Sequence, residues 1–152
     1  MVEASAAREP SAGRQGYRLE DLSVGMAASF AKTVTDADIV LYAGISGDTN
    51  PVHIDAELAA ATPFKERIAH GMLTASFISA VLGTILPGPG AIYLSQTLRF
   101  KAPVHPGDTV RATVRVTAID AARKRVTLET VCTVRDKTVI EGEALVMVPA
   151  RG

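Results

Sequence analysis

The alternation of apolar and polar residues predicts several β-strands along the chain. In residues 108–120 (DTVRATVRVTAID), valine or alanine occupies every second position, and threonine or arginine mostly fills the positions between them. A period of two is typical of a strand with one buried and one solvated face. The same pattern recurs in residues 91–101, 124–135 and 138–148, and a further strand is expected near residues 28–34. Short connections between the later segments favour antiparallel pairing.

A long uncharged segment follows His70 and predicts a buried helix. Residues 71–86 have apolar side chains on every side of a helical projection, and the run ends at Pro87-Gly88-Pro89-Gly90. A helix that is apolar all round must be surrounded by protein or by lipid. Its length of about 24 Å is shorter than the ~30 Å hydrocarbon core of a membrane. We therefore expect protein to enclose this helix, and we expect no membrane span.

Two shorter helices are expected before the long one. Asp36 is a candidate N-cap for a helix that ends near Gly47, and residues 56–61 favour a second, shorter helix. Together the elements predict an α+β domain in which a long apolar helix is wrapped by a curved antiparallel sheet of about five strands. This description fits the hotdog fold. We interpret residues 17–152 as a single hotdog domain that follows a flexible N-terminal tail, residues 1–16.

Composition and charge narrow the functional class. Of the 152 residues, 47% are hydrophobic and 21% are charged, which is enough apolar material for a packed core. The 16 basic and 16 acidic residues cancel, and such a balance argues against a dedicated nucleic-acid binder. Cys132 is the only cysteine, so no internal disulfide is expected. Residues 1–16 lack the pattern of a signal or transit peptide, and a cytoplasmic protein is the expectation.

The segment ISGDTNPVHID, residues 45–55, holds the candidate catalytic groups. Asp48 and His53 are separated by Asn50-Pro51, a dipeptide that stops a helix and favours a tight turn. Such a turn can bring a carboxylate and an imidazole toward one point. The spacing alone leaves a structural interpretation open, in which Asp48 satisfies turn amides and His53 packs at the surface.

Three blocks in order carry a resemblance to a known family. The segments SGDTNPVHID, AHGMLTASFISAVLG and GAIYLSQTLRFKAPVHPGD closely resemble the MaoC-like, (R)-specific enoyl-CoA hydratase family, over about residues 30–148. The resemblance implies that Asp48 and His53 are the catalytic pair and that Asn50 supports their loop. It also implies a hotdog homodimer, with the acyl tunnel and CoA near the subunit interface.

The implied reaction adds water to a trans-2-enoyl-CoA thioester and gives the (R)-3-hydroxyacyl product. This chemistry needs a base, an acid and stabilisation of the negative charge that develops on the thioester oxygen. We expect Asp48 to be the base and His53 the acid. CoA is part of the substrate, so no separate cofactor is expected.

The long apolar helix supplies the remaining candidate site residues. Gly71 begins it, where backbone N–H groups lack helical partners and the helix dipole is positive, so its N–H is the candidate oxyanion donor. Ser79 matches a serine of the family and either supports the catalytic pair or bonds back to its own helix. Leu82 matches a family position near the acyl tail and is the candidate substrate-binding residue. We expect His70 to hold the preceding loop rather than to act as a second acid.

Three other functions for a hotdog domain are compared with the sequence. A hotdog acyl-CoA thioesterase generally needs a carboxylate, often on the central helix, and residues 71–86 contain none. A non-catalytic acyl-CoA-binding subunit should lack Asp48 or His53, and both are present. A dehydratase of the same family for branched hydroxyacyl-CoA or acyl-carrier-protein substrates stays open. With only three dispersed histidines and one cysteine, a metal site is not expected.

Overall fold

The computed structural model describes residues 15–152. The expected flexible tail, residues 1–16, falls largely outside the described residues and stays a prediction. In chain order the elements are η1 (Leu19–Asp21), β1 (Ala27–Thr33), α1 (Asp36–Ser46), α2 (Pro51–Ile54), α3 (Ala56–Ala60), α4 (Gly71–Thr84), β2 (Ile92–Gln96), β3 (Arg99–Phe100), β4 (Thr109–Asp120), β5 (Arg125–Val134) and β6 (Lys137–Met147).

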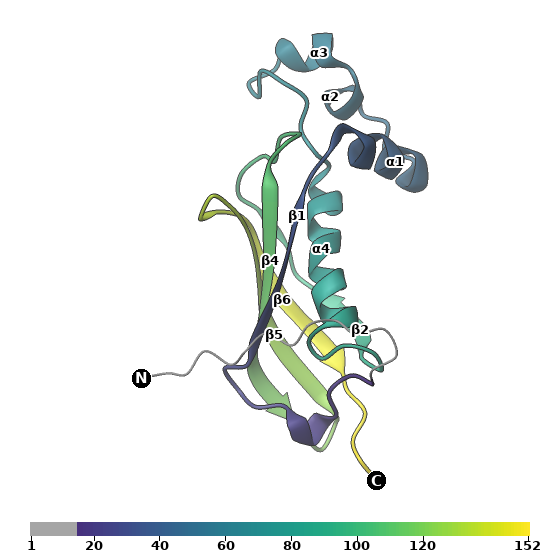
Figure 1. Ribbon diagram of the computed structural model, residues 1–152, viewed down its shortest axis with the longest axis vertical. Helices are drawn as coiled ribbons and strands as arrows, with labels where there is room; N and C mark the ends of the chain where they lie inside the picture. The colour runs from purple at the N-terminus through teal and green to yellow at the C-terminus, as the bar shows by residue number, and fades with distance from the viewer. Residues whose placement is uncertain (1–14) are drawn as a thin grey trace.

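The strands form one antiparallel, six-stranded sheet in the order β1-β4-β5-β6-β2, with β3 also paired to β6. The alternation seen in the sequence is the alternation of burial, since Val110, Ala112, Val114 and Val116 of β4 are all buried. The long helix α4 packs on this sheet (Figure 1). The predicted α+β hotdog architecture is therefore confirmed.

One predicted strand is divided in two. Residues 91–101 were expected to form a continuous strand, but β2 ends at Gln96 and β3 begins at Arg99. Between them the chain runs beside β6 and comes close to Gly142, where an added Cβ would lie 1.9 Å from the carbonyl oxygen of Thr97. Gly142 therefore allows a close backbone approach that the hydrophobic pattern does not reveal.

The sheet covers one side of α4 and leaves another side open in the single chain. Leu73, Phe77, Ile78, Val81 and Leu82 are buried. The open side carries Met72, Ser76, Ser79 and Gly83, which we call the open stripe. The expectation that protein encloses the whole helix is thus not met within one chain, because a single sheet covers only one face. No helix within residues 15–152 is long and apolar enough to cross a membrane.

The helices α1, α2 and α3 gather at the end of the sheet where α4 begins (Figure 1). The N-cap of α1 is Thr35 rather than the predicted Asp36, which is the first helical residue. Thr35 Oγ1 accepts from the Asp38 N–H at 3.1 Å, and Asp38 Oδ2 accepts from the Thr35 N–H at 3.0 Å. This reciprocal capping satisfies two amides at once, which Asp36 would not do. Helix α1 ends as predicted at Gly47, whose φ is +81°.

Candidate active site

The loop between α1 and α2 brings Asp48 and His53 together by short-range hydrogen bonds. Asp48 Oδ1 accepts from the Asn50 N–H at 3.2 Å, and Asn50 Oδ1 accepts from the Val52 N–H at 3.2 Å. Asn50 is thereby the N-cap of α2, and Pro51 occupies the first helical position, where its missing N–H has no cost. The single turn of α2 then carries His53 back toward Asp48.

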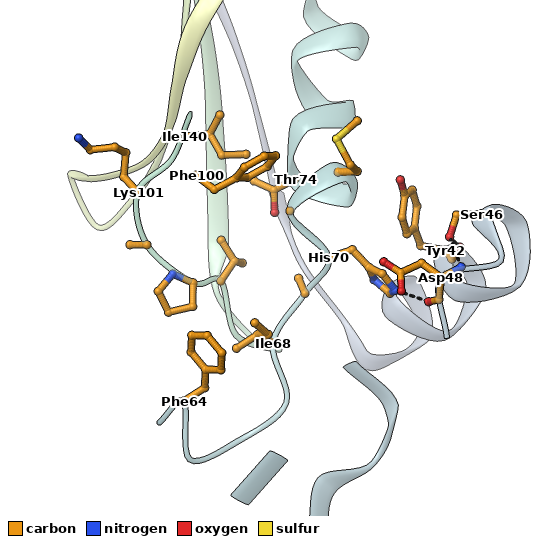
Figure 2. Close-up of a pocket in the computed structure, with 16 residues that line it drawn as sticks. Tyr42, Ser46, Asp48, Phe64, Ile68, His70, Thr74, Phe100, Lys101 and Ile140 are labelled. Atoms are coloured by element: carbon orange, nitrogen blue, oxygen red, sulfur yellow. Dashed lines mark hydrogen bonds between the residues drawn. The ribbon is translucent and has the colours of Figure 1, made fainter. Parts of the chain in front are cut away.

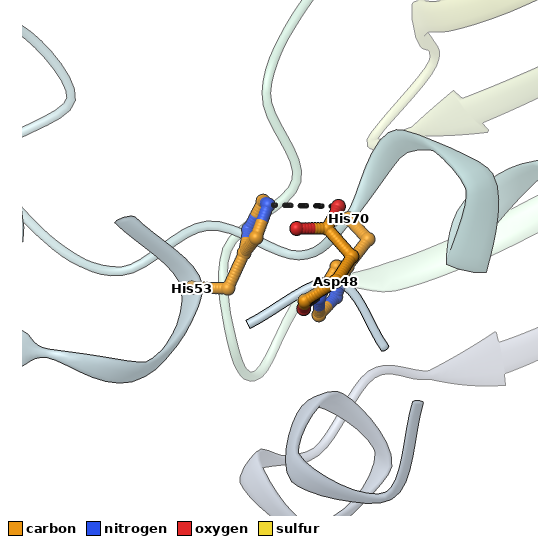
Figure 3. A group of neighbouring side chains, drawn as sticks. All are labelled: Asp48, His53 and His70. Atoms are coloured by element: carbon orange, nitrogen blue, oxygen red, sulfur yellow. Dashed lines mark hydrogen bonds and ion pairs between the residues drawn. The ribbon is translucent and has the colours of Figure 1, made fainter. Parts of the chain in front are cut away.

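Asp48 and His53 face each other across a gap of 4.0 Å between Oδ2 and Nε2 (Figure 3). The His53 ring is 8% exposed, whereas the Asp48 carboxylate is open to solvent. His53 Nδ1 lies 2.8 Å from the carbonyl oxygen of Ile68 and must donate its hydrogen to it. In the neutral ring Nε2 therefore carries the lone pair, and it faces Asp48.

A second buried imidazole, His70, completes the cluster. It is the N-cap residue of α4 and is 2% exposed. Its Nε2–H donates to the carbonyl oxygen of Asp48 at 2.8 Å. Its ring stacks on that of His53 with centroids 3.8 Å apart and an interplanar angle of 26°. The expectation that His70 holds the loop agrees with this hydrogen bond, although the stacking was not foreseen.

The same cluster could in principle bind a metal ion. One potential metal-ligating atom from each of Asp48, His53 and His70 lies within 4.8 Å of the other two. Tetrahedral coordination requires lone pairs that converge on one centre. Lone pairs of imidazole lie in the ring plane, so two stacked rings direct them side by side rather than toward a common point. In addition, one nitrogen of each ring faces a carbonyl oxygen. The group is therefore better suited to hold a water molecule than a metal ion.

Gly71 follows His70 and opens α4. As the first helical residue it has an N–H with no acceptor inside the helix, and the positive end of the helix dipole lies there. An added Cβ at Gly71 would lie 2.6 Å from Phe100 Cε1. Glycine is therefore needed for the close approach of the Phe100 ring, a reason that the sequence did not reveal.

A cavity of about 680 Å³ begins at Asp48, His70 and Gly71 and extends along a largely apolar wall (Figure 2). Phe64, Ile68, Phe100, Val104 and Ile140 contribute to this wall, and Lys101 also lines it. This combination of an apolar cavity and a few polar groups at one end is typical of a small-molecule site.

Thr74 and Cys132 have buried polar groups at or behind the cavity wall. Thr74, one helical turn after Gly71, is 1% exposed and lines the cavity, and its Oγ1 has no hydrogen-bond partner among the described residues. Behind Thr74, the Cys132 thiol faces the Thr74 carbonyl oxygen at 3.9 Å. Burial raises the pKa of the Cys132 thiol to about 12, so it is not a nucleophile at neutral pH.

The remaining predicted residues lie away from this cavity in the single chain. Ser79 is exposed on the open stripe of α4, and Leu82 is buried in the core. Neither lines the cavity, and their predicted roles stay predictions. Sequence reasoning did not select Thr74 or Phe100. The spacing of three residues between Gly71 and Thr74 was the available signal for Thr74, because it places both on one side of a helix.

Comparisons with known proteins agree with this geometry. Residues 23–139 match the family described as MaoC like domain. The chain is 63% identical to the (R)-specific enoyl-CoA hydratase of Rhodospirillum rubrum, covering 90% of this chain and 94% of the relative. It is 52% identical to the 3-hydroxybutyryl-CoA dehydratase of Methylorubrum extorquens, covering 87% and 84%. It also resembles the solved R-hydratase from Pseudomonas aeruginosa in its unliganded form, with a TM-score of 0.86, 45% identity and coverage of 90% and 88%.

Proposed function

Because the chain belongs to the MaoC-like domain family, we propose that it is an (R)-specific enoyl-CoA hydratase. It adds water reversibly across the double bond of trans-2-enoyl-CoA to give (R)-3-hydroxyacyl-CoA. The observation that carries the proposal is the gap of 4.0 Å between Asp48 Oδ2 and His53 Nε2, which lies beside an apolar cavity and a free helical N–H.

The gap suits one water molecule. A hydrogen bond spans at most about 3.2 Å between nitrogen and oxygen, so the two groups do not bond strongly to each other directly. A water at hydrogen-bond distance from both atoms forms an angle of roughly 90° between them, so it can donate one O–H to Asp48 Oδ2 and accept from the protonated Nε2 of His53. Its second lone pair then stays free to attack C3 of the enoyl group.

The two residues move one proton each. As the C3–O bond forms, one O–H bond of the water breaks and Asp48 takes that proton. His53, in its protonated form, delivers a proton from Nε2 to C2 of the substrate. The Ile68 carbonyl holds the Nδ1 hydrogen, so the delivered proton leaves from Nε2, on the side that faces Asp48. A later proton transfer from Asp48 to His53 restores both groups.

The Gly71 N–H stabilises the charge that develops on the thioester oxygen. Addition at C3 places negative charge on that oxygen before C2 is protonated. A preorganised backbone donor at the positive end of α4 meets that charge, and removal of one such donor typically costs about 3–4 kcal/mol of barrier stabilisation. The apolar wall of the cavity accommodates the uncharged acyl part of the thioester.

The first experiment follows crotonyl-CoA by the ultraviolet absorbance of its conjugated thioester. A hydratase removes this absorbance, yields (R)-3-hydroxybutyryl-CoA and releases no free thiol. Release of thiol would instead identify a thioesterase. No reaction with crotonyl-CoA, but turnover of a crotonyl group on acyl-carrier protein or of a branched substrate, would identify another dehydratase of the same family.

We propose in addition that the active form is a homodimer in the cytoplasm. Ile92, Tyr93 and Leu94 are consecutive exposed residues on β2, which is an edge strand of the sheet. Apolar residues on both faces of a free edge favour pairing with another chain. Sedimentation velocity tests this proposal, since Leu94→Lys should convert a dimer of the wild-type chain into a monomer.

A further inference from the structure

We propose that His70 is a positioning residue for the Asp48–His53 pair, retained for catalysis at some expense of stability. The inference rests on the proposed hydratase function and deepens it. The mechanism above moves no proton through His70, yet its buried ring contacts both members of the pair and directly precedes Gly71.

The hydrogen bond to Asp48 determines which nitrogen of His70 carries hydrogen. A carbonyl oxygen only accepts, so Nε2, 2.8 Å from the Asp48 oxygen, must be the donor. In the neutral ring, Nδ1 then has a lone pair. Nδ1 is buried and has no hydrogen-bond partner among residues 15–152. A buried acceptor without a donor is unfavourable, since it lost its contact with water and gained none in exchange.

For stability alone, phenylalanine would suit this position better than histidine. Its ring fills a similar space, retains the stacking on His53 and the tilted contact with Tyr42, and has no lone pair to desolvate. The Asp48 carbonyl would lose its donor, but this bond is only partly buried, so water reaches the carbonyl oxygen more easily than it reaches the enclosed Nδ1 of His70. The contribution specific to histidine is therefore the Nε2–H bond that fixes the backbone of Asp48.

That bond has a direct consequence for the catalytic gap. The Asp48 carboxylate is exposed, and the hydrogen bond it accepts from the Asn50 N–H reaches Oδ1 rather than the Oδ2 that faces His53, so the 4.0 Å gap also depends on where the backbone of Asp48 lies. If the carbonyl is released, the carboxylate can rotate toward Nε2 and pair with it, which removes the space for water. His70 thus holds the backbone of Asp48 through the hydrogen bond and the ring plane of His53 through stacking.

The test compares His70→Phe, His70→Gln and the wild-type chain in crotonyl-CoA hydration and in thermal unfolding. His70→Phe keeps a ring but has no donor, and His70→Gln keeps an N–H donor but has no ring. We expect His70→Phe to unfold at the same temperature as the wild type or higher, with kcat lowered at least about tenfold by misplacement of the pair. KM should stay within about threefold of the wild-type value, because the apolar wall is unchanged and phenylalanine keeps a ring of similar size at the end of the cavity. His70→Gln should recover part of the lost kcat.

His105→Gln is the matched control, because this histidine does not line the cavity, and its kcat should equal that of the wild type. An unchanged kcat in His70→Phe would overturn the inference. A lower unfolding temperature for His70→Phe would also overturn it, since the residue would then serve stability. If the wild-type chain does not hydrate crotonyl-CoA, the proposed function fails separately, and the unfolding comparison still decides whether His70 is kept against stability.

Discussion

The carboxylate of Asp48 and the imidazole of His53 stand 4.0 Å apart, too far for a strong direct bond and close enough to share one water molecule. Local features of the chain create this gap, namely the Asn50 cap and the proline that starts α2. A contact from far along the chain, the His70–Asp48 bond, keeps the loop in place.

Removal of either member of the pair should abolish most of the activity and leave the fold intact. We expect Asp48→Asn and His53→Gln each to lower kcat at least about 10²-fold, the usual effect of losing a positioned acid or base. Asparagine at position 48 retains an oxygen for the Asn50 N–H, so the turn should survive. Initial rates with crotonyl-CoA, together with circular dichroism, measure both effects.

Asp136→Asn is the matched control for the aspartate change. Asp136 is exposed in the turn between β5 and β6 with φ of +65°, a conformation that asparagine adopts readily. Wild-type rates are expected for this control. Wild-type rates in Asp48→Asn would exclude Asp48 as the base.

A methyl group at Gly71 should impair the site through Phe100. Gly71→Ala places Cβ 2.6 Å from a ring carbon of Phe100, so the ring must move toward the cavity or the helix must shift. We expect kcat/KM for crotonyl-CoA to fall about tenfold. Adding Phe100→Ala removes the contact and should restore part of the loss. Gly44→Ala in α1, where an added Cβ meets nothing within 4 Å, should behave as wild type.

Thr74→Val should stabilise the protein. The change removes a buried hydroxyl that has no hydrogen-bond partner among the described residues and keeps the shape of the side chain. We expect the free energy of unfolding to rise by about 1 kcal/mol, measured by urea denaturation. A loss of stability would mean that the hydroxyl has a partner in solution, such as a bound water.

Cys132 should resist alkylation while the protein is folded. Burial raises the pKa of its thiol to about 12, from an ordinary value of 9.0. At pH 8, modification by iodoacetamide should therefore occur only as fast as the chain unfolds, which mass spectrometry can follow with and without urea. Rapid labelling of the native protein would show that the thiol is accessible.

The raised pKa of the Cys132 thiol also predicts a loss of stability in alkaline solution. Between pH 9.0 and about 12 the unfolded chain releases the thiol proton, whereas the native chain retains it. The native state then binds more protons, so the free energy of unfolding decreases as pH rises through this range. Below pH 9.0 the contribution of the buried thiol is complete. Cys132→Ala should show a smaller decrease over the same range.

The sequence alone allowed us to predict the family and most of the helices and strands. The strand pattern in residues 108–120 and the uncharged run after His70 correspond to β4 and α4. The errors were local ones. Thr35 caps α1 in place of Asp36, because a threonine followed by Asp38 satisfies two amides. The strand pairing is interrupted between β2 and β3, where Gly142 allows a close backbone approach.

The periodicities, the turn at Asn50-Pro51 and the spacing of Asp48 and His53 could be read from the sequence, because each depends on neighbours a few residues away. The bond from His70 to a carbonyl 22 residues earlier and its stacking on His53 became visible in the folded chain alone. The same packing places Phe100 against Gly71 and leaves the Thr74 hydroxyl without a hydrogen-bond partner within residues 15–152. Such contacts join segments distant in the chain, and their geometry follows from how α4 packs on the sheet rather than from local preference.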